Sequence, residues 1–182
     1  MAAGAAISPA AIALAVDDQI TTYHAVARTS AVAAGPGYAT IEVEFELGAA
    51  LGGVIEQAMR AHFREVTDAA ACTAESRFLL RAEFAKPPEL HIRWLQRMVS
   101  EGGGATVDLA LAVSAQRCGG PIVWRAIVTG YGAAELIESN FLWTTPAAAQ
   151  FQPAVDAALA DLAQHLDAAL SAATQKELNS PS

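Results

Sequence analysis

The chain has 182 residues, of which 53% are hydrophobic, and its 11 Lys+Arg against 19 Asp+Glu give a formal net charge of −8. This length predicts one compact domain. An acidic chain is a poor candidate for nucleic acid, because neutralising phosphates supplies most of the non-specific affinity. No apolar run reaches the ~18 residues of a membrane span. The apolar opening 1–16 lacks the basic start of a signal peptide, although it is compatible with the mature start of an exported protein.

Two short strands are predicted near the N-terminus, over 11–16 and 20–27. The first run is apolar and ends at an acidic pair, and the second is rich in β-branched and aromatic residues. A linker with Gly35-Pro36-Gly37 follows. Residues 1–37 are therefore expected to form an N-terminal arm with short strands.

The clearest pattern lies in residues 41–66. Apolar residues alternate with glutamates over 41–47, which predicts a half-buried strand. After Gly48 the apolar residues recur three and four apart, which predicts a helix. A short strand is expected at 64–66. We expect these three elements to form a crossover unit, in which the helix covers one face of a single sheet.

The middle of the chain predicts more strands. One covers 77–84, and two others, 105–115 and 122–132, form a hairpin around a tight turn. Residues 89–100 alternate like a strand but also fit a helical stripe. We favour a strand, because Gly102–Gly104 have the composition of a hairpin loop that leads into the next strand.

The C-terminal part predicts one long helix after a loop-like stretch at 132–150, with Pro153 at its first helical position. Its apolar stripe consists of Phe151, Val155, Leu159, Leu162, Leu166 and Leu170. The polar tail 174–182 is expected to be disordered. The order of elements predicts an α+β domain over 38–173, with a mostly antiparallel sheet of about four strands and two amphipathic helices packed on one face.

Residue types that carry chemistry are present, but their spacing indicates no catalytic or metal site. The four histidines are His24, His62, His91 and His165. None belongs to an HxxxH or HExxH pattern, and neither cysteine has a ligand at zinc-site spacing. Gly102–Gly104 lack the Lys-Ser/Thr of a phosphate loop. We therefore expect no enzyme, no metal and no cofactor.

The two cysteines, Cys72 and Cys118, are 46 residues apart, each in a loop of small or polar residues beside a predicted strand. Loop cysteines at element ends are well placed to form a disulfide. Two unrelated thiols are the alternative. A disulfide would indicate an oxidising compartment.

Positive charge is concentrated in residues 56–125, which hold nine basic and eight acidic residues, whereas the rest of the chain holds two and eleven. The basic residues of two predicted strands, together with one tryptophan, suit an anionic partner through ion pairs and cation–π contacts. These candidate partner-binding residues are Arg77, Arg81, Arg93, Trp94 and Arg97. A solvated strand face is the alternative interpretation.

The order of the predicted strands and helices resembles that of a known group of proteins. A helix follows a glycine-containing strand exit at 46–66, then come the strand 77–84, a hairpin with Gly120-Pro121-Ile122-Val123-Trp124 and a long final helix. Over 38–172 this order resembles small Gram-negative outer-membrane lipoproteins of the LptE-like or YajG-like kind. The resemblance implies helices packed on a sheet, a periplasmic location, outer-membrane anchoring in the full-length form, and a binding role without catalysis. The chain departs from the group in having no lipobox and no lipidated cysteine.

We therefore expect a non-catalytic periplasmic envelope protein that acts in outer-membrane assembly or transport by binding an envelope protein partner or an anionic amphiphile. One alternative is a cytoplasmic small-molecule-binding or enzymatic α+β domain, which unpaired thiols would favour. Another is a subunit of a homo-oligomeric secretion assembly, which a discrete multimer would favour.

Overall fold

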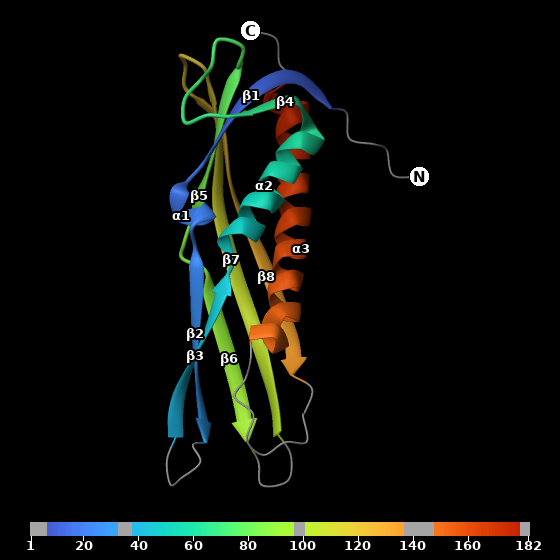
Figure 1. The fold of residues 1–182 in the computed structure, drawn as a ribbon. Helices are drawn as coiled ribbons and strands as arrows, with labels where there is room; N and C mark the ends of the chain where they lie inside the picture. The colour runs from blue at the N-terminus through green and yellow to red at the C-terminus, as the bar shows by residue number, and fades with distance from the viewer. Residues whose placement is uncertain (1–6, 33–37, 97–100, 137–147, 179–182) are drawn as a thin grey trace, which may run out of the picture.

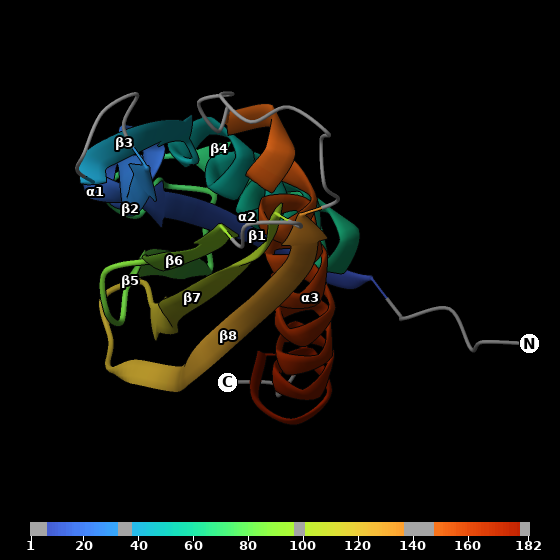
Figure 2. The ribbon, with the colours of Figure 1, turned by 90° about the horizontal axis from the view of Figure 1, so that it is seen from below.

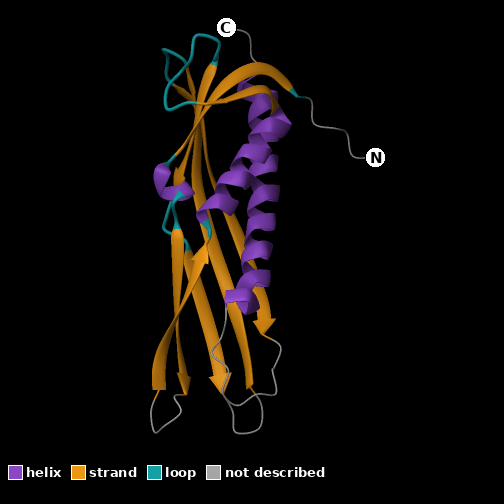
Figure 3. Ribbon diagram, in the orientation of Figure 1, coloured by secondary structure: helices purple, strands orange, loops and turns teal. Residues whose placement is uncertain are grey.

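The computed structural model describes residues 7–32, 38–96, 101–136 and 148–178 (Figure 1). The molecule is elongated, with long strands on one side and two helices on the other (Figure 3). The strands are β1 (Ser8–Val16), β2 (His24–Val32), β3 (Tyr38–Glu46), β4 (Phe63–Asp68), β5 (Phe78–Phe84), β6 (Glu89–Gln96), β7 (Glu101–Arg117) and β8 (Ile122–Leu136). The helices are α1 (Asp18–Thr21), α2 (Gly48–His62) and α3 (Ala148–Ala173), followed by the π-helical segment η1 (Thr174–Leu178).

The main sheet is mixed. β1 lies between β4 and β5 and is parallel to both, whereas β7 is antiparallel to β5, β6 and β8. β2 and β3 form a separate antiparallel sheet. The prediction of a mostly antiparallel sheet of about four strands is therefore wrong: this α+β fold has a six-stranded mixed sheet and a second sheet of two strands.

The error came from the choice of strand partners. The expected crossover placed 41–47 and 64–66 in one sheet, but β3 pairs with β2, and β4 pairs with β1. Alternation shows which face of a strand is buried and carries no information about the neighbouring strand. Burial explains the central place of β1, because Ile12, Ala13 and Leu14 are at most 2% exposed.

β7 organises the sheet. β5 pairs with its second half and β6 with its first half along one edge, while β8 pairs along the other edge. The strand favoured within 89–100 is confirmed over 89–96 as β6. Gly102–Gly104 lie inside β7 and not in a loop, because they pair with β6. Residues 97–100 lie outside the described residues. β8 also continues to Leu136, beyond the predicted start of a loop at 132.

α2 and α3 lie on the same side of the sheet (Figure 2). The predicted stripe of α3 is buried there except for Leu159, which is partly exposed, and Leu162, Leu166 and Leu170 have no exposed surface. Phe151 of α3 meets Phe45 of β3 edge to face, with ring centroids 6.3 Å apart, so the β2–β3 hairpin is tied to the same core. α3 begins at Ala148, and Pro153 lies inside it.

Two boundaries differ from the predictions near the chain ends. The strand predicted over 20–27 begins only at His24, because residues 18–21 form α1. The Asp17 side chain caps this helix by accepting a 2.7 Å hydrogen bond from the Gln19 N–H. In the segment expected as a tail, η1 continues from α3 and buries Leu178.

α3 packs closely along β8. A Cβ atom added to Gly132 or Gly130 would collide with the helix backbone at Ala154 and Ala158, so glycine permits this close approach. Further along, the Tyr131 N–H donates to Asp161 Oδ2 at 2.9 Å, and His165 Nδ1 lies 2.9 Å from the Thr129 carbonyl oxygen. Side chains of α3 therefore contact backbone hydrogen-bonding groups on the outer edge of β8, which would otherwise be open to pairing with another strand.

Candidate interaction face and cleft

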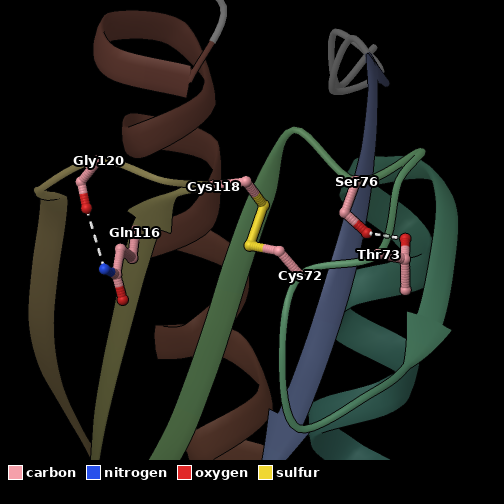
Figure 4. Close-up of a disulfide and its surroundings, with 6 residues drawn as sticks. All are labelled: Cys72, Thr73, Ser76, Gln116, Cys118 and Gly120. Carbon is pink, nitrogen blue, oxygen red and sulfur yellow. Dashed lines mark hydrogen bonds between the residues drawn. A yellow bond between two sulfur atoms is a disulfide. The ribbon is translucent and has the colours of Figure 1, made fainter.

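The connection between β4 and β5, residues 69–77, crosses β1. Both strands are parallel to β1 and lie on either side of it. Figure 4 shows the connection passing in front of β1, with the helices behind the sheet. Ala13 and Leu79, directly opposite each other on β1 and β5, are at most 4% exposed, although their strand neighbours Ile12 and Phe78 face the helices. The crossing connection thus covers the sheet on the side away from the helices.

A disulfide holds this connection. Cys72 is bonded to Cys118, which follows β7, and their Cα atoms are 5.7 Å apart. The backbone reinforces the link, since the Arg77 N–H donates to the Ala11 carbonyl at 2.9 Å and the Cys118 N–H donates to the Arg77 carbonyl at 3.1 Å. Of the two alternatives for the cysteines, the structure shows the disulfide.

Beyond the connection 69–77, toward the lower end of the molecule in Figure 1, no described element covers the sheet face opposite α2 and α3. We call the part of it on β5, β6, β7 and β8 the outer face. Figure 2 shows β7 and β8 with α3 on one side, and no described element covers their other side.

The structure places the candidate partner-binding arginines apart. Arg77 precedes β5, with its guanidinium 5.3 Å from the centre of the Phe78 ring. Arg81 is exposed on the outer face, opposite Ser114 of β7. Position 93 of β6 pairs with Gly104, which is ten residues before Ser114 in β7, or roughly 33 Å from the level of Arg81.

The two candidates on β6 lie too far along the sheet to form one cluster with Arg81. Positions 93 and 94 belong to opposite faces of β6, because successive strand residues alternate. The structure describes only the backbone of Arg93 and Trp94, and Arg97 lies outside the described residues.

The pairing reveals a residue that sequence reasoning missed. Arg81, Ser114 and Arg125 lie opposite one another on β5, β7 and β8, so they share one row of the outer face. The arginine Cα atoms are roughly 10 Å apart, two strand spacings. Both arginines are exposed, and neither forms an ion pair with any described residue. The predicted hairpin placed Arg125 on a strand, but only the register across three strands places it beside Arg81.

Lower on the outer face the charge is acidic. Glu89 of β6, Asp108 of β7 and Tyr131 of β8 form a row. His91, hydrogen-bonded to Glu89, and Lys86 beside it hold the pKa of the Glu89 carboxyl below its ordinary value. Asp108 has no ion-pair or hydrogen-bond partner among the described residues.

A separate cleft of about 420 Å³ opens where β1 and β4 end, next to α1 and α2. Its lining includes the carboxylates Asp18, Glu56 and Asp68 and the small residue Gly52. Arg60 forms a 2.6 Å ion pair with Glu56, which leaves two carboxylates without a cation among the described residues. A positively charged group suits such a lining.

One histidine is buried. His62 of α2 is 1% exposed, and its Nε2 lies 2.7 Å from Asp167 Oδ1 of α3, while its Nδ1 has no hydrogen-bond partner in the described part of the chain. This contact joins the two helices. Among the described residues, no three His, Cys, Asp or Glu side chains gather closely enough to hold a metal ion.

Comparison of the sequence with protein-family models and with curated proteins gives no match. None of the described helices has both the length and the apolar character needed to cross a lipid bilayer.

Proposed function

We propose that this protein is a non-catalytic envelope protein of the periplasm, which acts in outer-membrane assembly or transport by binding a protein partner or an anionic amphiphile. The observation that carries the proposal is the disulfide between Cys72 and Cys118. Disulfides persist in oxidising compartments such as the periplasm and are rare in the cytosol. The bond ties a surface connection to the end of a strand, which suits a protein that works outside the cytosol.

The outer face supports a binding role. It combines Arg81 and Arg125, which are exposed and form no ion pair with a described residue, with the large apolar side chains of Ile127 and Tyr131, which are 69% and 53% exposed. Interaction surfaces are enriched in arginine and aromatic residues. We propose that partners bind this face, with Arg77 and Arg81 among the residues that contact them. Arg93, Trp94 and Arg97 remain proposed contacts.

Location is tested in cells that make the protein naturally. We expect the chain in the osmotic-shock or membrane fraction, with both cysteines resistant to alkylation under denaturing conditions unless a reductant is added first. A cytosolic marker protein and a known periplasmic disulfide protein serve as controls. Recovery of the chain in the cytosolic fraction with both thiols alkylated would remove the proposal.

Partner binding is tested by reversing charge. In cross-linking and co-purification from the same cells, Arg77→Glu with Arg81→Glu should reduce partner recovery at least tenfold. Arg60→Glu with Arg64→Glu changes the net charge equally on α2 and β4, away from the outer face, and should retain the partner. Equal recovery with both pairs would exclude a role for Arg77 and Arg81.

The cleft supports a second function, the binding of a small cationic molecule. Its volume of about 420 Å³ lies within the range of small-molecule sites. Gly52→Phe should fill the cleft without disturbing the fold, since a Cβ there meets only Thr21 Cγ2 at 3.8 Å. Native mass spectrometry of the wild type and this variant, with a panel of amines, tests this function. No amine retained by the wild type, or equal retention by both proteins, would count against it.

A further inference from the structure

The outer face has an uneven distribution of charge along its strands. Its upper rows hold Arg81 and Arg125, with Glu83 as the only described carboxylate beside them on this face. Its lower rows hold Glu89 and Asp108. Lys86 lies 3.5 Å from Glu89 and offsets part of that negative charge, but Asp108 is unpaired among the described residues.

The centre of the face is partly apolar. Ala112, which is partly exposed, and Ala110, which is buried, lie between the two charged regions on β7, and Ile127 and Tyr131 flank them on β8. Both of these large side chains on the edge strand β8 are more than half exposed, and exposed hydrophobic side chains that share one face mark an interaction surface.

We propose that the outer face binds a second copy of this chain, with the two sheets packed face to face. The two-fold axis runs across the strands and crosses β7 between Ala110 and Ala112. This operation places the row of Ser114 over the row of Asp108 in the second copy, because the two rows are equally far from the axis. The inference rests on the proposed function, since it names the partner of the same face.

This arrangement is electrostatically self-complementary. Arg81 of one copy lies over Glu89 of the other, because β5 and β6 follow each other along the same edge of β7. Ser114 lies over Asp108, and Arg125 lies over Tyr131, which suit a hydrogen bond and a cation–π contact. Each contact occurs twice, as a two-fold interface requires.

The other face-to-face arrangement is unfavourable. A two-fold axis parallel to the strands would place each row over itself, so the arginine row of one copy would meet the arginine row of the other. Like charges in contact across an interface cost several kcal/mol. The charges therefore select the axis that runs across the strands.

The size of the face sets the expected affinity. Ten residues of overlap on three strands correspond to roughly 34 Å by 14 Å, or about 500 Å² per copy in projection. Twice this area is near the ~1,000 Å² that marks the lower limit of a specific interface. We expect a dimer with micromolar affinity, formed by oxidised protein without any other partner.

Sedimentation velocity of the purified, disulfide-bonded chain from about 1 to 100 µM tests the proposal. The wild type should pass from monomer to dimer over this range. Arg81→Glu with Arg125→Glu should remain monomeric, because the glutamate at position 81 faces Glu89 of the other copy and the cation over Tyr131 is lost. Glu89→Arg with Asp108→Arg should also remain monomeric. Arg60→Glu with Arg64→Glu, which lies away from the face, should dimerise like the wild type.

An equimolar mixture of the two charge-reversed proteins gives the decisive result. In the mixed dimer the glutamate at position 81 of one protein lies over the arginine at position 89 of the other, and the original contact between Arg81 and Glu89 forms at the equivalent position, so association should return with at least ten times the affinity of either variant alone. Damaged folding would not produce this rescue. A wild type that stays monomeric at 100 µM, reversed variants that still dimerise, or a mixture without rescue would each overturn the proposal. Cell location and thiol state, which test the proposed function, are unaffected by these results.

Discussion

Removal of the disulfide should lower the stability of the fold by a large and calculable amount. Cys72 and Cys118 are 46 residues apart, and the loop they close contains β5, β6 and β7. In the chain-entropy treatment, closing a loop of this length lowers the conformational entropy of the unfolded state, which destabilises that state by about 4 kcal/mol at 25 °C. Domains of this kind have total stabilities of roughly 5–15 kcal/mol. The variant Cys72→Ala with Cys118→Ala should therefore still fold, but with a small remaining free energy of unfolding.

Urea unfolding followed by tryptophan fluorescence measures this loss. With a slope of about 2 kcal/mol per molar urea, the transition midpoint should fall by about 2 M. Wild-type protein treated with a reductant should show the same midpoint as the double variant. Thr73→Ala, which alters the same connection but keeps the disulfide, should unfold within about 0.5 kcal/mol of the wild type.

Hydrogen exchange distinguishes a disulfide that stabilises the whole fold through the unfolded state from one that only holds residues 69–77 in place. If the disulfide stabilises through the unfolded state, the slowest-exchanging amides of β5 and β7 should lose protection together, by the same free energy as in urea. If only residues 69–77 open while the global midpoint stays within 0.5 M of the wild type, the entropic reasoning is refuted.

Three further predictions follow from local contacts. Gly132→Ala should destabilise the protein by roughly 1–3 kcal/mol, because the added methyl group meets the α3 backbone, whereas Gly53→Ala, with no atom within 4 Å of its Cβ, should be neutral or stabilising in thermal unfolding. Asp161→Ala removes the partner of an edge amide and should increase the exchange rate at Tyr131 N–H without moving the melting temperature by more than a few degrees. In an NMR titration the Glu89 carboxyl should have a pKa below its ordinary value, and His91→Ala should raise it. The small stability that this carboxylate adds is present above its unfolded pKa and is lost as pH falls through the folded value.

These local predictions have clear opposite outcomes. Equal melting of the two glycine variants would mean that α3 can move away from β8 without cost. Unchanged amide exchange in Asp161→Ala would mean that another group protects the edge. An ordinary Glu89 pKa that does not respond to His91→Ala would mean that the pair does not form in solution.

Several features could be predicted because their causes are local. Alternation over 77–84 and 105–115 matched the burial of β5 and β7, and the stripe from Phe151 to Leu170 matched the buried face of α3. The hairpin of β7 and β8 followed from two alternating runs around a tight turn. The loop positions of Cys72 and Cys118 left a disulfide and free thiols as alternatives, which distance in the folded chain decided.

The amino-acid sequence by itself therefore determined most of the strands and helices, and which side of most of them is buried, since these depend on neighbours a few residues away. Tertiary structure alone decided that β1 lies between β4 and β5, that residues 69–77 cross it, and that Arg81 and Arg125 share a row. The physical reason is that strand pairing joins residues distant in sequence. The partner and register that bury the most apolar surface depend on the whole chain.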